Sequence, residues 1–167
     1  MFVALSFSPY QKHVMANTYS QVHLHFVFAV QNRMSLIQDQ WQNQLYKYIT
    51  SIAQNRGHKV LAIGGTKDHI HILMGFGLEQ SISSLMLEIK RDSSAWINSR
   101  HFVMGSFSWQ KGYGCFSYSK SQIPAVIRYI QGQEQHHSKC SLEEEYKNML
   151  RLSTIDYDVR YILKSIE

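Results

Sequence analysis

The sequence predicts an α+β fold in which an antiparallel β-sheet is covered by helices. Apolar and polar residues alternate over residues 19–30, which is the period of a β-strand, and apolar residues recur at helical spacing over 41–52 and 82–97. Two further apolar runs, at 60–63 and 69–76, are separated by a glycine-containing turn and predict a β-hairpin. With one more short strand after the second helix, the order is β-α-β-β-α-β. This order is typical of a ferredoxin-like or RRM-like sheet with helices on one face.

The first predicted strand has two chemically different faces. Because successive side chains of a strand point to opposite sides, His23 and His25 project together from the face opposite the apolar set. The helix that follows is expected to end near Gly57, since glycine commonly terminates helices. The connection within the hairpin begins at Gly64-Gly65. The apolar set of the first strand comprises Val22, Leu24, Phe26, Phe28 and Val30.

The second half of the chain predicts three helices and one strand. Serines at the start of a helix over 81–98 offer an N-cap, and residues 107–118 have the composition of strand and turn. Ser121 is expected to cap a late helix that runs to about Gln135. The pattern Ser141-Leu-Glu-Glu is a capping box that opens a short tail helix, and the acidic run 143–145 is expected to favour that helix start and nothing more.

The length and composition fit one domain with short appendages. The 167 residues are 44% hydrophobic and 17% charged, which allows a substantial core and argues against wholesale disorder. We expect an N-terminal extension at 1–14, a main domain at 15–140 and a helical C-terminal tail at 141–167. The formal net charge of +5 permits a nucleic-acid partner without requiring one.

The cysteines and the apolar runs indicate the cellular compartment. Cys115 and Cys140 are too few for a disulfide-rich secreted scaffold or a four-cysteine zinc site. No apolar run approaches the roughly 20 residues of a membrane-spanning helix. The apolar residues 1–5 have neither the basic leader nor the cleavage site of a signal peptide. We therefore expect a cytoplasmic protein with reduced thiols and no membrane partner.

Two His-x-His pairs are candidate metal ligands. His69 and His71 flank an isoleucine on the third predicted strand, so both imidazoles point to one face and can share a divalent ion. His23 and His25 have the same spacing on the first strand. Either pair could bind the metal, or the four could line one surface. Two half-exposed histidines without any metal are an equally good interpretation of the pattern alone.

A tyrosine on the late helix is a second candidate. Tyr129 and Gln133 are four residues apart and therefore lie on one face of a helix. A half-buried core tyrosine would be the ordinary interpretation. However, Tyr129 falls beside the apolar stripe, and Gly132 costs a helix about 1 kcal/mol relative to alanine. The stripe itself consists of Val126, Ile127 and Ile130.

Four segments together resemble the single-tyrosine HUH transposases of small bacterial insertion sequences, which include the REP-associated tyrosine transposases. HUH stands for His, bulky apolar residue, His. The segments are 19–28 in the first strand, 64–71 with the sequence GGTKDHIH, 108–113 with SWQKGY, and 129–133 with YIQGQ. They occur in the order of the family and together span roughly residues 17–137.

This resemblance implies a site and a reaction. His69 and His71 would be metal ligands in preference to the first-strand pair, Gln133 would be a third ligand, and Tyr129 would be the nucleophile. The metal would be Mg²⁺ or Mn²⁺. The enzyme would cleave and rejoin DNA through a covalent phosphotyrosine intermediate that conserves the energy of the phosphodiester.

The ligand set departs from the family at one position. Some members carry an acidic residue three positions before the first histidine, where this chain has Thr66. Asp68 projects from the opposite strand face and is not counted as a ligand. Water, a substrate phosphate or another side chain such as His136 would then complete the coordination.

The resemblance also implies the partners. The substrate would be single-stranded DNA that carries hairpins, and the protein would be a homodimer whose active sites are shared between subunits. Candidate phosphate-binding residues are Arg33, Lys67, Lys90, Arg91 and Lys111, and candidate base-stacking residues are Trp109, Tyr113 and Phe116.

Three other functions remain open at this stage. The first is a non-catalytic module that binds DNA or RNA hairpins. The second is an HUH nuclease of replication initiation or plasmid transfer, and the third is a domesticated REP-associated nuclease. The joint presence of His69, His71, Tyr129 and Gln133 favours an enzyme, because binding alone requires none of them.

Overall fold

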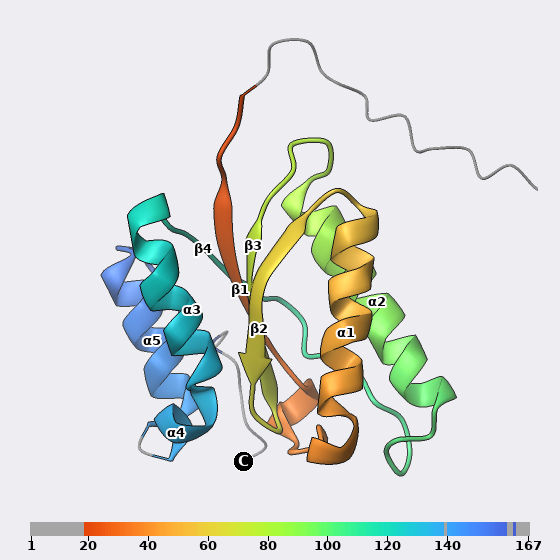
Figure 1. Cartoon of the computed structure of the whole chain (residues 1–167). Coiled ribbons are helices and arrows are strands. Elements are labelled where there is room, and N and C mark those ends of the chain that lie inside the picture. Colours follow the sequence, from red (N-terminus) through yellow and green to blue (C-terminus); the bar gives the residue numbers. More distant parts are fainter. Residues whose placement is uncertain (1–18, 139, 160–161, 163–167) are drawn as a thin grey trace, which may run out of the picture.

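The computed structural model describes residues 19–138, 140–159 and 162 and shows an α+β fold around a four-stranded antiparallel sheet (Figure 1). The sheet order is β2-β3-β1-β4, so that β1 pairs antiparallel with both β3 and β4. This is the strand order of a ferredoxin-like sheet, as predicted. The strands are β1 (His23–Ala29), β2 (Lys59–Gly65), β3 (His69–Gly75) and β4 (Gly114–Ser117).

Helices cover both faces of the sheet. The two helices of the predicted β-α-β-β-α-β core, α1 and α2, lie on one face, and the later helices α3, α4 and α5 lie on the other (Figure 1). Two short 3₁₀ helices, η1 and η2, precede α1 and α3. None of the helices within the described ranges is long and apolar enough to cross a membrane. The bounds are η1 Gln31–Arg33, α1 Asp39–Asn55, α2 Ile82–Ser99, η2 Lys120–Gln122, α3 Ile123–Gln131, α4 Gln133–His137 and α5 Leu142–Leu152.

The main core lies between the sheet and the helices α1 and α2. The alternation predicted for the first strand is confirmed, because Leu24, Phe26 and Phe28 are all buried on this side. Ser81 caps α2 by accepting a hydrogen bond from the backbone N–H of Ser84, also as predicted. The opposite face of β1 and β3 carries three buried histidines, His25, His69 and His71, among apolar side chains.

Helix α3 packs very closely on the edge strand β2. A Cβ at Gly64 would lie 2.5 Å from the backbone oxygen of Ile130, so no larger residue fits without displacing the helix. Val126 and Ile130 of α3 are buried with Ala62 and Leu73 of the sheet in a second apolar cluster. The glycine in the hairpin therefore sets how near the late helix comes to the strands.

The late helix differs from its prediction in two ways. Ser121 does not cap it, because the 3₁₀ helix η2 precedes α3 and carries the capping box, which is formed by Ser119 and Gln122. It ends at Gln131 instead of about Gln135, since Gly132 terminates α3 and a separate short helix α4 follows. Helix α4 begins directly after Gly132, and its first residue, Gln133, contacts His69 of the sheet.

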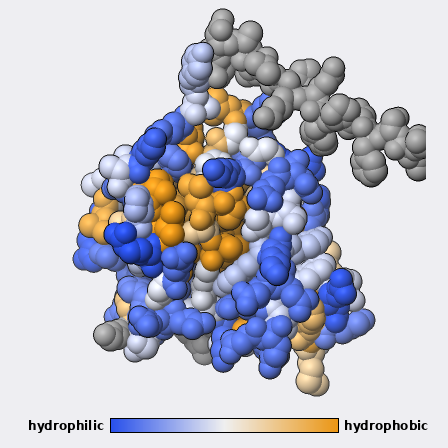
Figure 2. Space-filling model, in the orientation of Figure 1, coloured by the Kyte–Doolittle hydropathy of each residue, from blue (hydrophilic) through white to orange (hydrophobic). Residues whose placement is uncertain are grey.

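The tail begins as predicted, with the capping box of Ser141 and Glu144 at the start of α5. Cys115 and Cys140 are free thiols. In Figure 2 apolar side chains gather over β2 and the adjoining side of α3, while most of the surrounding surface is hydrophilic. The predicted extension at 1–14 lies outside the described residues.

Candidate metal and nucleophile site

The two predicted ligand histidines lie on the face of the sheet that α3, α4 and α5 cover. Both His69 and His71 are fully buried. His25 of the neighbouring strand is buried beside them, and its Nε2 lies 3.0 Å from Nδ1 of His71. Of the first-strand pair, His25 thus belongs to the same surface as the third-strand pair, whereas His23 is partly exposed.

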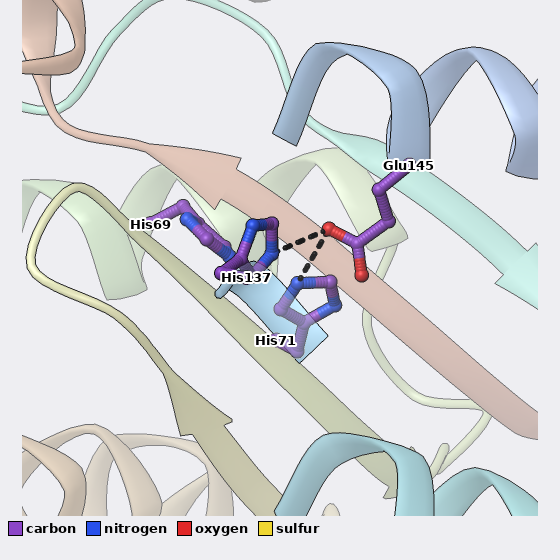
Figure 3. A group of neighbouring side chains, drawn as sticks. All are labelled: His69, His71, His137 and Glu145. Atoms are coloured by element: carbon purple, nitrogen blue, oxygen red, sulfur yellow. Dashed lines mark hydrogen bonds and ion pairs between the residues drawn. The ribbon is translucent and has the colours of Figure 1, made fainter. Parts of the chain in front are cut away.

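Four side chains from three elements converge here. His69 and His71 come from β3, His137 from α4 and Glu145 from α5, and Figure 3 shows them pointing toward one another. Each of the four residues offers one nitrogen or oxygen atom, and these four atoms all lie within 4.8 Å of one another. Oε2 of Glu145 lies 2.9 Å from Nε2 of His137 and 3.6 Å from Nε2 of His71. Three imidazoles and one carboxylate at this spacing are suited to hold a divalent ion.

His69 is oriented by a network on its outer side. Its Nδ1 lies 2.7 Å from Oδ1 of Asp68 and 2.9 Å from Oγ1 of Thr66, while Arg33 donates to Oδ2 of Asp68 at 3.0 and 3.1 Å. Burial by itself would raise the pKa of Asp68, but the hydrogen bonds from His69, Thr66 and Arg33 and the charge of His69 lower it well below its usual range. A carboxylate accepts hydrogen bonds, so Nδ1 of His69 donates to Asp68, and Nε2 is the ring nitrogen on the side of the cluster.

His71 directs a nitrogen to the same point. Its Nε2 is buried and has no hydrogen bond to any described residue. Burial first, and then the neighbouring imidazoles, lower the pKa of His71 well below 6.5. Burial likewise lowers the pKa of His25 to about 4, and burial together with His69 lowers the pKa of His137 to about 4. Neutral imidazoles are the form that binds metal ions.

The structure brings the predicted third ligand and nucleophile to this cluster. Gln133 is buried, with Oε1 at 3.4 Å from Nε2 of His69 and Nε2 donating to Oε1 of Glu145 at 3.0 Å. The ring centroids of Tyr129 and His71 lie 5.9 Å apart. The hydroxyl of Tyr129 donates to Oε1 of Glu145, the oxygen that Gln133 also contacts. His136, suggested as a further ligand, packs against Tyr129 with its Nε2 3.7 Å from Glu145.

Glu145 is the residue that the sequence analysis missed. It is only 4% exposed, and burial followed by the charge of Asp68 raises its pKa to about 8. The interpretation of 143–145 as a helix-start signal alone is therefore wrong for Glu145, although Glu143 and Glu144 are exposed as expected. The signal was present in the helical spacing of the tail, whose buried face comprises Leu142, Glu145, Tyr146, Met149 and Leu150.

Comparison with known proteins identifies the family. A family model described as "Transposase IS200 like" matches residues 18–133. The chain belongs to the IS200-like transposase family. The match ends at Gln133, so the site contributions of His137 and Glu145 come from beyond the matched region.

Two solved structures share the fold of this IS200-like family member. One is a candidate transposase from Deinococcus radiodurans R1, 20% identical, with 71% of this chain and 95% of that chain covered and a TM-score of 0.56. The other is a REP-associated tyrosine transposase bound to a REP hairpin, 17% identical, with 73% and 72% covered and a TM-score of 0.56. No match was found among curated proteins.

The residues predicted to contact DNA fall into two groups. Arg33 and Lys67 line a polar groove of about 610 Å³ that also includes Asp68 and reaches the histidine cluster at His137. The second group lies by α2, on the other face of the sheet, and lines or adjoins a separate cleft of about 400 Å³. This second group consists of Lys90, Arg91, Trp109, Lys111 and Tyr113.

Several members of the second group are engaged within the protein. The ammonium of Lys90 donates to the backbone oxygens of Gln110 and Gly112 at 2.6 and 2.7 Å. Trp109 is buried and donates its indole N–H to Ser93 at 2.8 Å. Phe116, a predicted stacking residue on β4 that belongs to neither group, is also buried. Of the three predicted stacking residues, only Tyr113 has a partly exposed ring.

Proposed function

We propose that this protein is a metal-dependent transposase that cleaves and rejoins single-stranded DNA beside hairpins, with Tyr129 as the nucleophile. The observation that carries the proposal is the convergence of a tyrosine hydroxyl and a buried histidine pair on one cluster, in a member of the IS200-like family. A purely structural tyrosine would not need to meet two imidazoles and a buried carboxylate.

The side chains present fit a divalent metal ion. His69 and His71 each direct one nitrogen into the cluster, and Gln133, His137 and Glu145 are placed to complete the ligand set. A nitrogen-rich set of this kind suits Mn²⁺ better than Mg²⁺, which prefers oxygen ligands. A bound divalent ion would draw negative charge from the scissile phosphate and orient it for in-line attack.

The chain itself supplies the nucleophile and its support. Oη of Tyr129 attacks phosphorus, the bond from phosphorus to the 3′ oxygen breaks, and that oxygen leaves as a 3′-hydroxyl after taking up a proton. The phenol loses its proton as the ester forms, and Glu145 is the carboxylate that already touches this hydroxyl. The DNA is then attached to the tyrosine by a 5′-phosphate, and a 3′-hydroxyl can reverse the reaction without ATP.

The DNA partner is proposed from the resemblance and from one solved relative. The REP-associated relative is bound to a REP hairpin, and the net charge of +5 suits a polyanion. The predicted homodimer with shared active sites stays a prediction. In the chain described here, Tyr129 meets the histidines of its own polypeptide, which supports a site assembled in cis.

A covalent-adduct assay tests the proposal. The full chain is incubated with hairpin-bearing single-stranded DNA and Mn²⁺ or Mg²⁺, and the protein–DNA adduct is resolved on a denaturing gel. We expect Tyr129→Phe to abolish the adduct while hairpin binding survives. Tyr118→Phe, which alters a second tyrosine near His25, is the matched control and should retain it. An adduct in the Tyr129→Phe protein would show that the nucleophile is another residue.

The metal ligands are tested in the same assay. His69→Ala and His71→Ala should lose metal-dependent cleavage, whereas His23→Ala, which alters a partly exposed side chain, should have a milder effect. Equal losses in all three proteins would contradict the assignment of the third-strand pair. Hairpin binding without an adduct in either metal, by the unaltered protein, would instead identify a non-catalytic binding module.

A further inference from the structure

A cleft of about 510 Å³ opens between α3 and α5, and Tyr129 forms part of its wall. Its buried lining consists of the apolar Val126 and Met149 and the carboxylate of Glu145. The half-buried ring of Tyr118 borders the same space, and the exposed Arg151 stands at its rim. The cleft therefore offers an apolar surface with an aromatic ring directly beside the proposed nucleophile.

We propose that this cleft is the subsite for one unpaired nucleobase, that of the nucleotide whose 5′-phosphate becomes attached to Tyr129. The inference rests on the proposed function. Once the ester has formed, the sugar and base of that nucleotide are separated from Oη of Tyr129 by only a few covalent bonds. Its base must therefore occupy space that borders the tyrosine.

The chemistry of the cleft favours a base over a phosphate. Arg151 is accompanied by the carboxylates of Glu144 and Glu145, so the lining carries no net positive charge with which to hold a polyanion. The apolar lining and the ring of Tyr118 suit the flat face of a base, and stacking of this kind tolerates any sequence. The volume lies within the range of about 300–1,000 Å³ found for small-ligand pockets.

The groove on the other side of the site has the opposite character. Its lining is mainly polar, contains Arg33 and Lys67 together with the carboxylates of Asp39, Asp68 and Glu134, and reaches the histidine cluster at His137. Of the two hollows that border the site, the cleft between α3 and α5 is thus the one with the apolar surface that a base requires. Helix α5, which forms one wall of the cleft, lies beyond the region matched by the family model, so the subsite depends on the tail of this chain.

The test removes the base and then fills the cleft. The cut position is first mapped with the unaltered protein, and the substrate is then resynthesised with an abasic nucleotide immediately 3′ of the scissile phosphate. We expect the rate of adduct formation in Mn²⁺ at subsaturating DNA to fall by about 10-fold, which is the size expected for one base stacked on an aromatic ring.

The protein is altered in parallel. Ala125→Trp places a large side chain on an exposed α3 position that lines the cleft, and Leu152→Trp does the same from α5. Both should slow adduct formation with the ordinary substrate by about as much as base removal does, and neither should slow it further with the abasic substrate. Gln131→Trp, on an exposed α3 position outside the cleft lining, is the matched control and should be unchanged.

The outcomes separate this inference from the proposed function. Equal rates with ordinary and abasic substrates in the unaltered protein would overturn the subsite while leaving the transposase proposal intact. Equal slowing of both substrates by both tryptophan variants would also overturn it, because the effect would then not depend on the base. Absence of any adduct with the unaltered protein would instead refute the proposed function on which the subsite rests.

Discussion

Replacement of Asp68 by asparagine tests how the site orients His69, a proposed metal ligand. Oδ1 of Asp68 lies 2.7 Å from Nδ1 of His69, and Oδ2 accepts two hydrogen bonds from Arg33. Both side chains of the Asp68–Arg33 ion pair are only about one-sixth exposed, at 15% and 16%. An asparagine at this position would keep one oxygen acceptor but lose the charge, and its amide would present N–H groups to donors that need an acceptor.

The structure sets the size of the expected effect. Loss of the outer hydrogen-bond partner of a metal-binding histidine typically reduces metal affinity by about 10- to 100-fold. We expect the upper end of this range for Asp68→Asn, because the same substitution also removes the partner of the shielded Arg33 guanidinium. A 100-fold loss corresponds to about 2.7 kcal/mol of binding free energy.

Manganese titration measures this loss directly. The free Mn²⁺ signal in electron paramagnetic resonance gives the dissociation constant without reference to catalysis, and thermal unfolding of the metal-free proteins checks that the fold is intact. Asp92→Asn is the matched control, because it removes a partly exposed carboxylate that also pairs with an arginine, Arg91. If Asp68→Asn binds Mn²⁺ as tightly as the Asp92→Asn control does, Asp68 does not orient His69 and the argument fails.

Two further predictions concern the late helix. Gly64→Ala should lower the free energy of unfolding by about 1–3 kcal/mol, because the new methyl group would overlap the backbone oxygen of Ile130. Urea unfolding measures this loss. The control is Gly75→Ala, which should cost less because its Cβ would have ordinary contacts at 3.8 Å. If the site is assembled in cis, a mixture of Tyr129→Phe and His71→Ala proteins should form no adduct, whereas restored adduct formation would show that subunits exchange the tyrosine helix.

The sequence was sufficient to predict the parts of the site that depend on local geometry. The two-residue period of a strand places His69 and His71 on one face whatever the rest of the fold does, and the structure has them there. The helical spacing of Tyr129 and Gln133 likewise brought both side chains to one side, even though Gly132 divides the predicted helix in two. Such relations hold within a single element and need no knowledge of its neighbours.

The remaining contacts depend on which elements lie side by side. The spacing of His23 and His25 is the same as that of the third-strand pair, and only the pairing of β1 with β3 decides that His25 lies against His71. Glu145 is even harder to single out from the sequence, because the two residues before it, Glu143 and Glu144, are exposed carboxylates. The direction in which α5 docks on the sheet follows from tertiary packing, and a capping box carries no information about it.

The positions of the site side chains depend on two glycines, Gly64 and Gly132, which have no functional side chain. The absence of a side chain at Gly64 lets α3 approach β2, and this approach holds the ring of Tyr129 within 5.9 Å of that of His71. The break at Gly132 then turns the chain so that α4 can present His137 to the same cluster. Glu145 contacts Tyr129 of α3 and His137 of α4, so α5 couples the position of the proposed nucleophile to that of the proposed metal ligands. A change in the tail of the chain should therefore alter metal binding and tyrosine reactivity together, although the tail lies outside the region that defines the family.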